Sequence, residues 1–196
     1  MATAISHPIP IFTIGYGNRN FDEFVELLKK YQISYLIDIR SSPYSKYNPD
    51  FTKNTLDTNL TKHNIRYVYM GDTLGGRPNL PSCYTDGRVD YQKLREKDFY
   101  KQGINRLQTA WKQKLRVVLF CSETKPEECH RSKLVGESLV ALGIEVVHID
   151  EKGELKIHSK VISELTNGQL SFFGTPTSLT KSRKKYRQGE VPNDKS

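Results

Sequence analysis

The stretch VVLFCSETKPEECHRS, residues 117–132, indicates the fold class of this chain. Its first four residues are apolar and two of them are β-branched, which predicts a strand buried on both faces. The strand ends at Cys121, a polar loop follows, and apolar residues then recur at helical spacing between Ser132 and Leu142. This succession of strand, loop and helix is typical of an α/β fold, and its loop collects cysteine, histidine, glutamate and arginine.

Further strand-like segments alternate with helical segments along the rest of the chain. The expected strands are 11–14, 35–39, 66–69 and 144–149, and the expected helices are 21–28, 52–63, 91–113, in one or two pieces, and 158–165. Asn20 is expected to cap the first helix, with Glu23 completing a capping box. This alternation predicts a three-layer α/β domain with a mainly parallel sheet of about five strands and helices on both faces.

The ends of the chain and one internal segment lack this periodicity. Residues 1–10 are predicted to be an N-terminal arm, 11–167 the α/β domain, and 168–196 a basic, flexible tail. The segment 71–89 is a long polar excursion, and loops of this length inside a compact domain are usually functional or mobile.

Composition restricts the class of protein. With 36% apolar and 27% charged residues, the chain is not disordered throughout. No apolar run approaches the roughly 20 residues of a membrane span, the N-terminus lacks the pattern of a signal peptide, and three cysteines indicate no disulfide framework. We therefore expect a cytoplasmic protein without a membrane partner. The net charge of +8, about half of which lies beyond residue 174, suggests a polyanionic partner such as nucleic acid.

The strand-to-helix loops are expected to form one pocket. Right-handed crossovers place all these loops at the carboxyl edge of a parallel sheet, where open α/β sheets bind ligands. Several cations beside a helix N-terminus suit an anion, most simply a phosphate. The residues that the loops would bring together are Tyr16, Asn18, Arg19, Asp38, Arg40, Gly75, Gly76, Arg77, Cys121, Glu123, Cys129, His130 and Arg131.

The charged members of this set suggest two kinds of role. Arg40, Arg77 and Arg131 are expected to hold the anion. Asp38 and Glu123 are the acid/base candidates, because two facing carboxylates in a partly buried site have their pKa values pushed apart. The alternative for Asp38 is a structural ion pair with one of the three arginines.

The two cysteines of the loop are candidates for a reactive thiolate. Cys129 precedes a helix N-terminus and Arg131, both of which lower the pKa of a thiol. Cys121 ends an apolar strand, so its alternative role is that of a small buried apolar residue. A brace between the two, reduced or transiently oxidised, is an alternative, and so is a metal site with His130 and His148. The spacing fits no strong zinc pattern, so the sequence assigns no metal ligand and leaves the cofactor unknown.

Four motifs of the chain, in this order, resemble the DUF488 family. They are Thr13-Ile14-Gly15-Tyr16, Asp38-Ile39-Arg40, Leu74-Gly75-Gly76-Arg77, and Cys121-Ser122-Glu123 with Cys129-His130-Arg131-Ser132. The resemblance implies a shared fold and shared site residues but no reaction, because the function of the family is unassigned. Tyr16 stands where the family usually has His, which removes a titratable group, and Ser122 stands where it usually has Ala.

A fainter similarity, to rhodanese-like and cysteine-phosphatase domains, concerns architecture alone. Those domains also have a strand ending in Cys, a loop, and Arg-Ser at the start of a helix. Here the loop between Cys121 and Arg131 is too long for a compact anion cradle, and its glutamates would repel a phosphate or sulfate.

One peptide of the tail suggests a protein partner. Gln169, Leu170, Phe172 and Phe173 are similar to the peptide by which bacterial DNA polymerases and repair proteins hold the sliding clamp. Such an extended peptide would insert its leucine and phenylalanine into an apolar pocket. The alternative is that both phenylalanine rings pack on the domain itself. The cations between 181 and 187 would add contacts to nucleic-acid phosphates.

The sequence therefore favours an enzyme-like domain that binds a phosphate-bearing ligand, a nucleotide or a nucleic acid, at the carboxyl edge of its sheet. A hydrolase or transferase reaction, and an association with DNA repair or replication, follow as hypotheses. The alternatives are a non-catalytic adaptor for nucleic acid or the sliding clamp, and a thiol-based redox or sulfur-handling protein.

Overall fold

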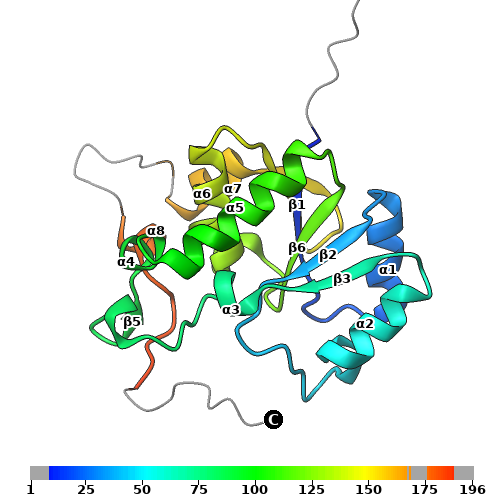
Figure 1. Ribbon diagram of the computed structural model, residues 1–196, viewed down its shortest axis with the longest axis horizontal. Coiled ribbons are helices and arrows are strands. Elements are labelled where there is room, and N and C mark those ends of the chain that lie inside the picture. The colour runs from blue at the N-terminus through cyan, green and yellow to red at the C-terminus, as the bar shows by residue number, and fades with distance from the viewer. Residues whose placement is uncertain (1–8, 167, 169–175, 188–196) are drawn as a thin grey trace, which may run out of the picture.

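The structure, a computed structural model, describes residues 9–166, 168 and 176–187. A central sheet of six strands has the order β3-β2-β6-β1-β7-β8 and is covered by helices on both faces (Figure 1). The first five strands in this order run parallel, and β8 is antiparallel to β7. The strands are β1 (Ile11–Gly15), β2 (Tyr35–Asp38), β3 (Arg66–Tyr69), β6 (Val117–Cys121), β7 (Val146–Ile149) and β8 (Leu155–Ile157). The predicted α/β fold with a mainly parallel sheet is confirmed.

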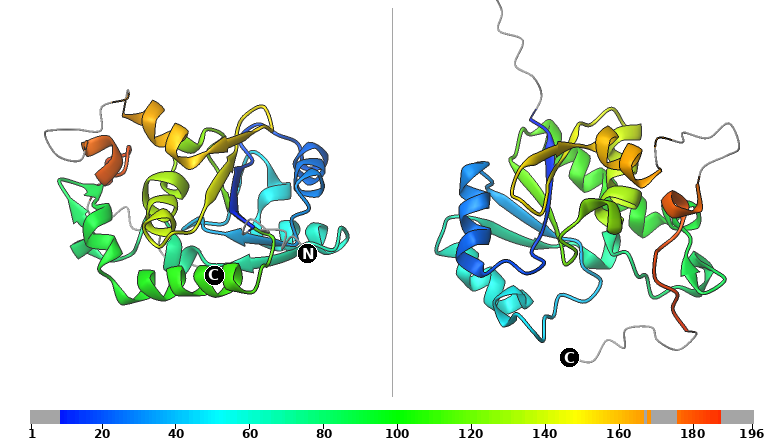
Figure 2. Two further views of the ribbon diagram at one scale, coloured as in Figure 1. Left: turned by 90° about the horizontal axis from the view of Figure 1, so that it is seen from above. Right: turned by 180° about the vertical axis from the view of Figure 1, so that it is seen from behind.

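The helices form the two outer layers. They are α1 (Phe21–Lys30), α2 (Lys53–Thr61), α3 (Gly71–Leu74), α4 (Tyr91–Arg95), α5 (Asp98–Lys112), α6 (Glu137–Ala141), α7 (His158–Leu165) and α8 (Thr177–Thr180), with short turns η1 (Pro49–Phe51), η2 (Pro81–Cys83) and η3 (Pro126–Glu128). Phe24 and Leu56 bring α1 and α2 onto one face of the sheet, and Ile104 and Leu139 bring α5 and α6 onto the other (Figure 2). Within the described residues, no helix has the length and apolar character needed to cross a bilayer.

A local capping signal places the start of α1 as expected. Asn20 accepts a hydrogen bond from the backbone N–H of Glu23 at 2.9 Å, and the Glu23 carboxylate accepts from the N–H of Asn20 at 3.2 Å. The predicted capping box of α1 is therefore present. The helix predicted over 91–113 is divided into α4 and α5.

The sequence patterns did not predict three of the strands, because these strands are very short. β8 has three residues at the sheet edge, and its Leu155 and Ile157 are exposed, so no buried apolar run marks it. The excursion after β3 contains a small hairpin of β4 (Tyr84–Thr85) and β5 (Arg88–Val89). Asp86 and Gly87 connect them with φ of 53° and 74°, the two positive values that a tight type I′ turn requires.

The helix expected after the reactive loop begins with an irregular turn. Residues Arg131–Gly136 form a π-helical turn, here called η4, and α6 continues from it. The Ser132 hydroxyl lies 2.5 Å from the carbonyl oxygen of Pro126 and 3.1 Å from that of Cys129, so it ties the turn to the loop before it. Single π-helical turns are rare and are often found at functional sites.

Part of the predicted tail lies on the domain. Residues 176–187, here called the strap, contain α8 with its buried Leu179 and then follow the β4–β5 hairpin (Figure 1). The N–H of Ser182 donates to the Val89 carbonyl at 2.9 Å, and the Ser182 hydroxyl accepts from the N–H of Val89 at 3.0 Å. The sequence analysis predicted a flexible tail here. It could not reveal these contacts, because they join residues that are far apart in the chain. The clamp-like peptide with Gln169, Leu170, Phe172 and Phe173 lies outside the described residues, as does most of the predicted arm 1–10.

A chain of polar contacts crosses the core between β1 and α7. The Thr13 hydroxyl lies 2.7 Å from Nδ1 of His148, whose Nε2 lies 2.9 Å from Nδ1 of His158, and Nε2 of His158 lies 2.8 Å from the Glu137 carboxylate. If His158 donates to that carboxylate, each ring nitrogen and the hydroxyl has one matching partner with both histidines neutral. Burial lowers the pKa of His148 well below its usual value, and the nearby charges of Arg131, His158 and Lys156 lower it further.

This histidine should make stability depend on pH. Because the folded state resists protonation of His148 while the unfolded state binds a proton near pH 6.5, stability is complete above that pH and is lost as the pH falls below it. The expected slope from this residue is about 1.4 kcal/mol per pH unit. Urea unfolding between pH 5 and 8 measures it. His148→Asn should lower the slope by the contribution of one proton; equal slopes in the wild type and the variant would contradict this account.

Candidate functional site

A pocket of about 170 Å³ opens at the carboxyl edge of the sheet. Six of the residues that the sequence assigned to a shared pocket line it, namely Arg40, Gly76, Arg77, Cys121, Glu123 and His130. Arg77 and Glu123, from loops that are distant in the sequence, thus meet as the crossover rule predicts. The strap supplies Ser182, Arg183, Lys184 and Tyr186 to the same wall.

A cluster of two thiols, an imidazole and a carboxylate lies at this pocket, and Cys121, Glu123 and His130 of the cluster line it. Nδ1 of His130 lies 3.7 Å from Sγ of Cys121 and 3.7 Å from Sγ of Cys129. Cys121 also contacts the Glu123 carboxylate at 3.0 Å. Both cysteines are buried and free, while His130 is half-buried. We call these four residues the thiol cluster.

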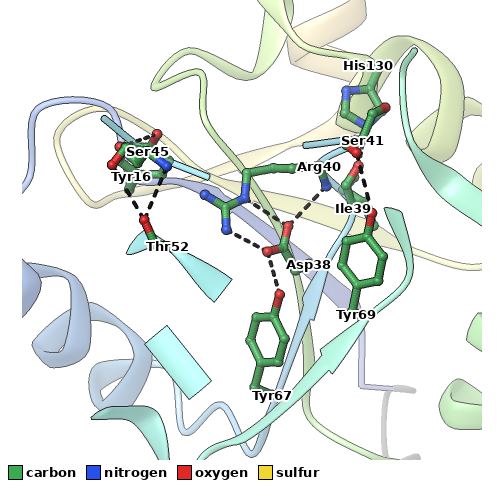
Figure 3. A network of polar contacts seen from close by, with 10 residues as sticks. All are labelled: Tyr16, Asp38, Ile39, Arg40, Ser41, Ser45, Thr52, Tyr67, Tyr69 and His130. Atoms are coloured by element: carbon green, nitrogen blue, oxygen red, sulfur yellow. Dashed lines mark hydrogen bonds and ion pairs between the residues drawn. The ribbon is translucent and has the colours of Figure 1, made fainter. Parts of the chain in front are cut away.

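The orientation of the His130 ring is set by its neighbours. Its Nε2 lies 3.0 Å from the carbonyl oxygen of Ile39, directly after β2 (Figure 3). Because a carbonyl oxygen only accepts, Nε2 carries the proton and Nδ1 presents a lone pair to the sulfurs. A Cβ atom on Gly76 would lie 2.6 Å from Cγ of this ring. Gly76, one of the residues expected in the pocket, therefore makes room for the imidazole.

The two thiols differ in acidity. A hydrogen bond from Cys129 lowers the pKa of Cys121 to about 7 against the effect of burial, and His130 lowers it further. Burial raises the pKa of Cys129 well above its usual value, as does the neighbouring Cys121. Burial would lower the pKa of His130, but the charges of Cys121 and Glu123 raise it overall. The sequence favoured Cys129 as the more acidic thiol. Arg131 does lower the pKa of Cys129, but burial outweighs its effect.

Asp38 belongs to a separate network. Its carboxylate accepts from Nε of Arg40 at 2.9 Å, from Nη2 at 2.6 Å, and from the backbone N–H of Arg40 at 3.0 Å, and Tyr67 donates its hydroxyl proton at 2.7 Å (Figure 3). Burial would lower the pKa of Arg40, but the Asp38 carboxylate raises it overall. Both members of the pair are buried, and the Arg40 guanidinium lies 4.6 Å from the centre of the Phe120 ring. This is the structural ion pair that was the alternative for Asp38.

The pleat of the sheet separates Asp38 from the thiol cluster. Along β6, Val118 and Phe120 face α1 and α2, while Val117 and Leu119 face α5 and α6, so Cys121 continues the second series. Asp38 pairs in register with Phe120 and shares its face. Asp38 therefore does not line the pocket beside Glu123, although both lie at the carboxyl ends of adjacent strands.

Two of the arginines expected in the pocket stabilise loops instead. The Arg131 side chain is fully buried, and its Nη2 donates to the Thr124 carbonyl at 2.8 Å. Arg19 donates from its guanidinium to the carbonyls of Gly15 and Asp150. Neither residue lines the pocket. Both arginine side chains point inward because their loops fold over them. The residue type alone does not predict this orientation.

The other predicted site residues lie around the pocket without lining it. The Tyr16 ring stacks on Phe51 with centroids 4.4 Å apart, and its hydroxyl donates to Ser45 at 3.2 Å. Asn18 is exposed on the turn after β1, and the N–H of Gly75 ends α3 by donating to the Gly71 carbonyl at 3.1 Å.

The strap residues of the pocket were missed as site residues. The Arg77 guanidinium lies 4.5 Å from the centre of the Tyr186 ring, and Arg183 forms an ion pair with Glu128 at 3.0 Å. The cation run with a tyrosine inside it was visible in the sequence, but it suggested nucleic acid rather than a pocket wall. No local pattern could place Tyr186 beside Arg77.

A model of the family described as "Domain of unknown function DUF488" matches residues 20–137. The chain belongs to the DUF488 family. The matched range includes Arg77 and the whole thiol cluster, whereas the strap lies beyond it. The comparison with curated proteins found no match, and neither did the comparison with solved structures. The rhodanese-like resemblance therefore has no support from either.

Proposed function

We propose that this DUF488 protein is an enzyme-like domain whose pocket binds the phosphate end of a small ligand. The position of Arg77 carries the proposal. This arginine lines the pocket, its guanidinium lies on the Tyr186 ring, and among the described residues its buried Nε has no hydrogen-bond partner. An arginine with free donors at a pocket wall is suited to a phosphate, which accepts several charge-assisted hydrogen bonds.

The charges of the pocket support an anionic ligand. Arg40 is compensated by Asp38, so the remaining cations are Arg77, Arg183 and Lys184 against the acids Glu123 and Glu128. Because Arg183 already pairs with Glu128, Arg77 and Lys184 are the cations that a ligand would meet.

The size of the pocket limits the ligand. A volume of about 170 Å³ is below the roughly 300–1,000 Å³ of pockets that enclose drug-sized molecules. A phosphate or a compact phosphorylated group would fit, whereas the base of a nucleotide would lie outside. The half-buried Tyr186 at the wall offers a ring on which a base could stack.

The thiol cluster supplies the chemistry beside this phosphate. Cys121, Glu123 and His130 line the same pocket and include a sulfur nucleophile and groups that exchange protons. Hydrolysis or transfer of a phosphate-bearing group is the reaction class that follows.

Arg77→Ala should weaken phosphate binding about 10- to 100-fold, because a hydrogen bond to a charged group contributes about 1.5–3 kcal/mol. Isothermal titration calorimetry with inorganic phosphate and with a nucleoside monophosphate measures this. Arg77→Lys should retain part of the affinity, and Arg106→Ala, an exposed arginine on α5, should retain all of it. Equal affinity of Arg77→Ala and wild type, or no binding of either compound to the wild type, would overturn the proposal.

A further inference from the structure

Three side chains of the thiol cluster converge on one point. The sulfurs of Cys121 and Cys129 and a ring nitrogen of His130 all lie within 4.8 Å of one another. We propose that these three residues bind one Zn²⁺ ion whose fourth coordination position faces the pocket. Neither the site nor its test depends on the binding of phosphate.

The spacing of the three atoms fits tetrahedral zinc. With Zn–S near 2.3 Å and Zn–N near 2.0–2.1 Å, tetrahedral angles separate sulfur from nitrogen by about 3.6 Å. Both observed separations, from Nδ1 of His130 to Sγ of Cys121 and to Sγ of Cys129, are 3.7 Å. The two separations that involve the imidazole therefore match those of a tetrahedral zinc site.

The surroundings of the ligands suit a metal. Because the Ile39 carbonyl accepts a hydrogen bond from Nε2 of His130, the unprotonated Nδ1 points at both sulfurs. A hydrogen bond from the second ring nitrogen of a ligating histidine to a carbonyl is a common feature of metal sites. The backbone N–H of Arg131 donates to Sγ of Cys129 at 3.4 Å, a contact that stabilises a thiolate.

The charge of the complex also fits its buried position. Two thiolates and a neutral imidazole compensate the charge of Zn²⁺ fully, and the Glu123 carboxylate, 3.0 Å from Sγ of Cys121, remains as the one charge of the thiol cluster beside the ion. A zinc site with three protein ligands and one open position is the arrangement of catalytic rather than structural zinc. Cys121, His130 and Glu123 line the pocket, so a water or a ligand oxygen could occupy the open position.

Cobalt titration of the full chain tests the site. After removal of metal under reducing conditions, Co²⁺ should bind in one equivalent and show both thiolate-to-cobalt charge-transfer bands and the visible bands of tetrahedral Co²⁺. Cys121→Ser and Cys129→Ser should each remove about half of the charge-transfer intensity, since each removes one of two thiolates. His130→Gln should weaken binding about 10-fold or more, and Zn²⁺ should displace the bound Co²⁺.

Cys83→Ser is the matched control, because Cys83 is also a buried free cysteine but lies outside the cluster. It should leave the spectrum unchanged. The absence of these bands in the wild type, or equal spectra before and after replacement of either cluster cysteine, would overturn the inference.

A measurement on the wild type keeps the test decisive if a variant fails to fold. Alkylation of Cys121 and Cys129, located by peptide mass spectrometry, should slow about 10-fold or more when Zn²⁺ is added, because metal-bound thiolates are protected. Unchanged alkylation rates would overturn the inference, and so would a disulfide between the two cysteines in protein purified without a reductant. A failure of either kind leaves the Arg77 experiment unaffected.

Discussion

Asp38→Ala is expected to lower the free energy of unfolding by about 3–5 kcal/mol, because it leaves the Arg40 charge buried without its partner. Both side chains are almost inaccessible, at 0% and 3% exposure, so water cannot replace the lost carboxylate. The loss includes three hydrogen bonds from Arg40 and one from Tyr67. Urea unfolding at neutral pH, with circular dichroism as the signal, measures the change.

Two variants separate the ion pair from the other contacts. Tyr67→Phe removes only one hydrogen bond and should cost about 1 kcal/mol. The double replacement Asp38→Leu with Arg40→Met removes both charges and should recover much of the lost stability, since apolar residues of similar volume often substitute for buried pairs. If Asp38→Ala unfolds within 1 kcal/mol of wild type while an activity of the protein disappears, the acid/base role first considered for Asp38 would be favoured instead.

Gly15→Ala is expected to lower the free energy of unfolding by about 3 kcal/mol, at the upper end of the range for overpacking. A Cβ atom there would lie 1.7 Å from the Glu123 carbonyl oxygen and 2.6 Å from Nη1 of Arg131. Neither neighbour can move freely, because the loop is held to β1 by backbone hydrogen bonds of 3.2 Å and 3.0 Å, from Tyr16 to Cys121 and from Gly17 to Ser122.

This replacement should also disturb the pocket, because the Glu123 carbonyl that the methyl group displaces belongs to the loop carrying the thiol cluster. Binding of phosphate, measured as for Arg77→Ala, should weaken along with stability. Gly143→Ala is the matched control: nothing lies within 4 Å of its added Cβ, and only its φ of 74° opposes the change, at about 1 kcal/mol. Gly15→Ala and Gly143→Ala with equal effects would show that the clash is relieved by movement of the loop.

Sequence patterns were sufficient for the elements with strong local signals. The apolar run before Cys121 predicted β6, and the pair Asn20 and Glu23 predicted the start of α1, because burial on both faces and helix capping are properties of adjacent residues. The crossover rule then brought Arg77, Glu123 and His130 to one edge of the sheet. The layers and part of the pocket therefore follow from local signals and topology.

Other features depended on how the elements pack. Asp38 and Cys121 are separated because their side chains lie on opposite faces of the sheet. The Arg131 side chain lies in the core because of the path of its loop. Cys129 and His130 lie between η3 and the π-helical turn, and the course of the chain there, which has no simple sequence signature, brings them to Cys121.

The position of the strap also could not be predicted from the sequence. Tyr186 lies on Arg77 because distant backbone groups at Val89 and Gly87 pair with the strap, and no spacing in the sequence encodes that pairing. Patterns among residues close together in the sequence specify whether a segment forms a helix or a strand, because the interactions involved are local. The partners of a polar side chain are specified by contacts across the fold, which exist only after the elements have packed.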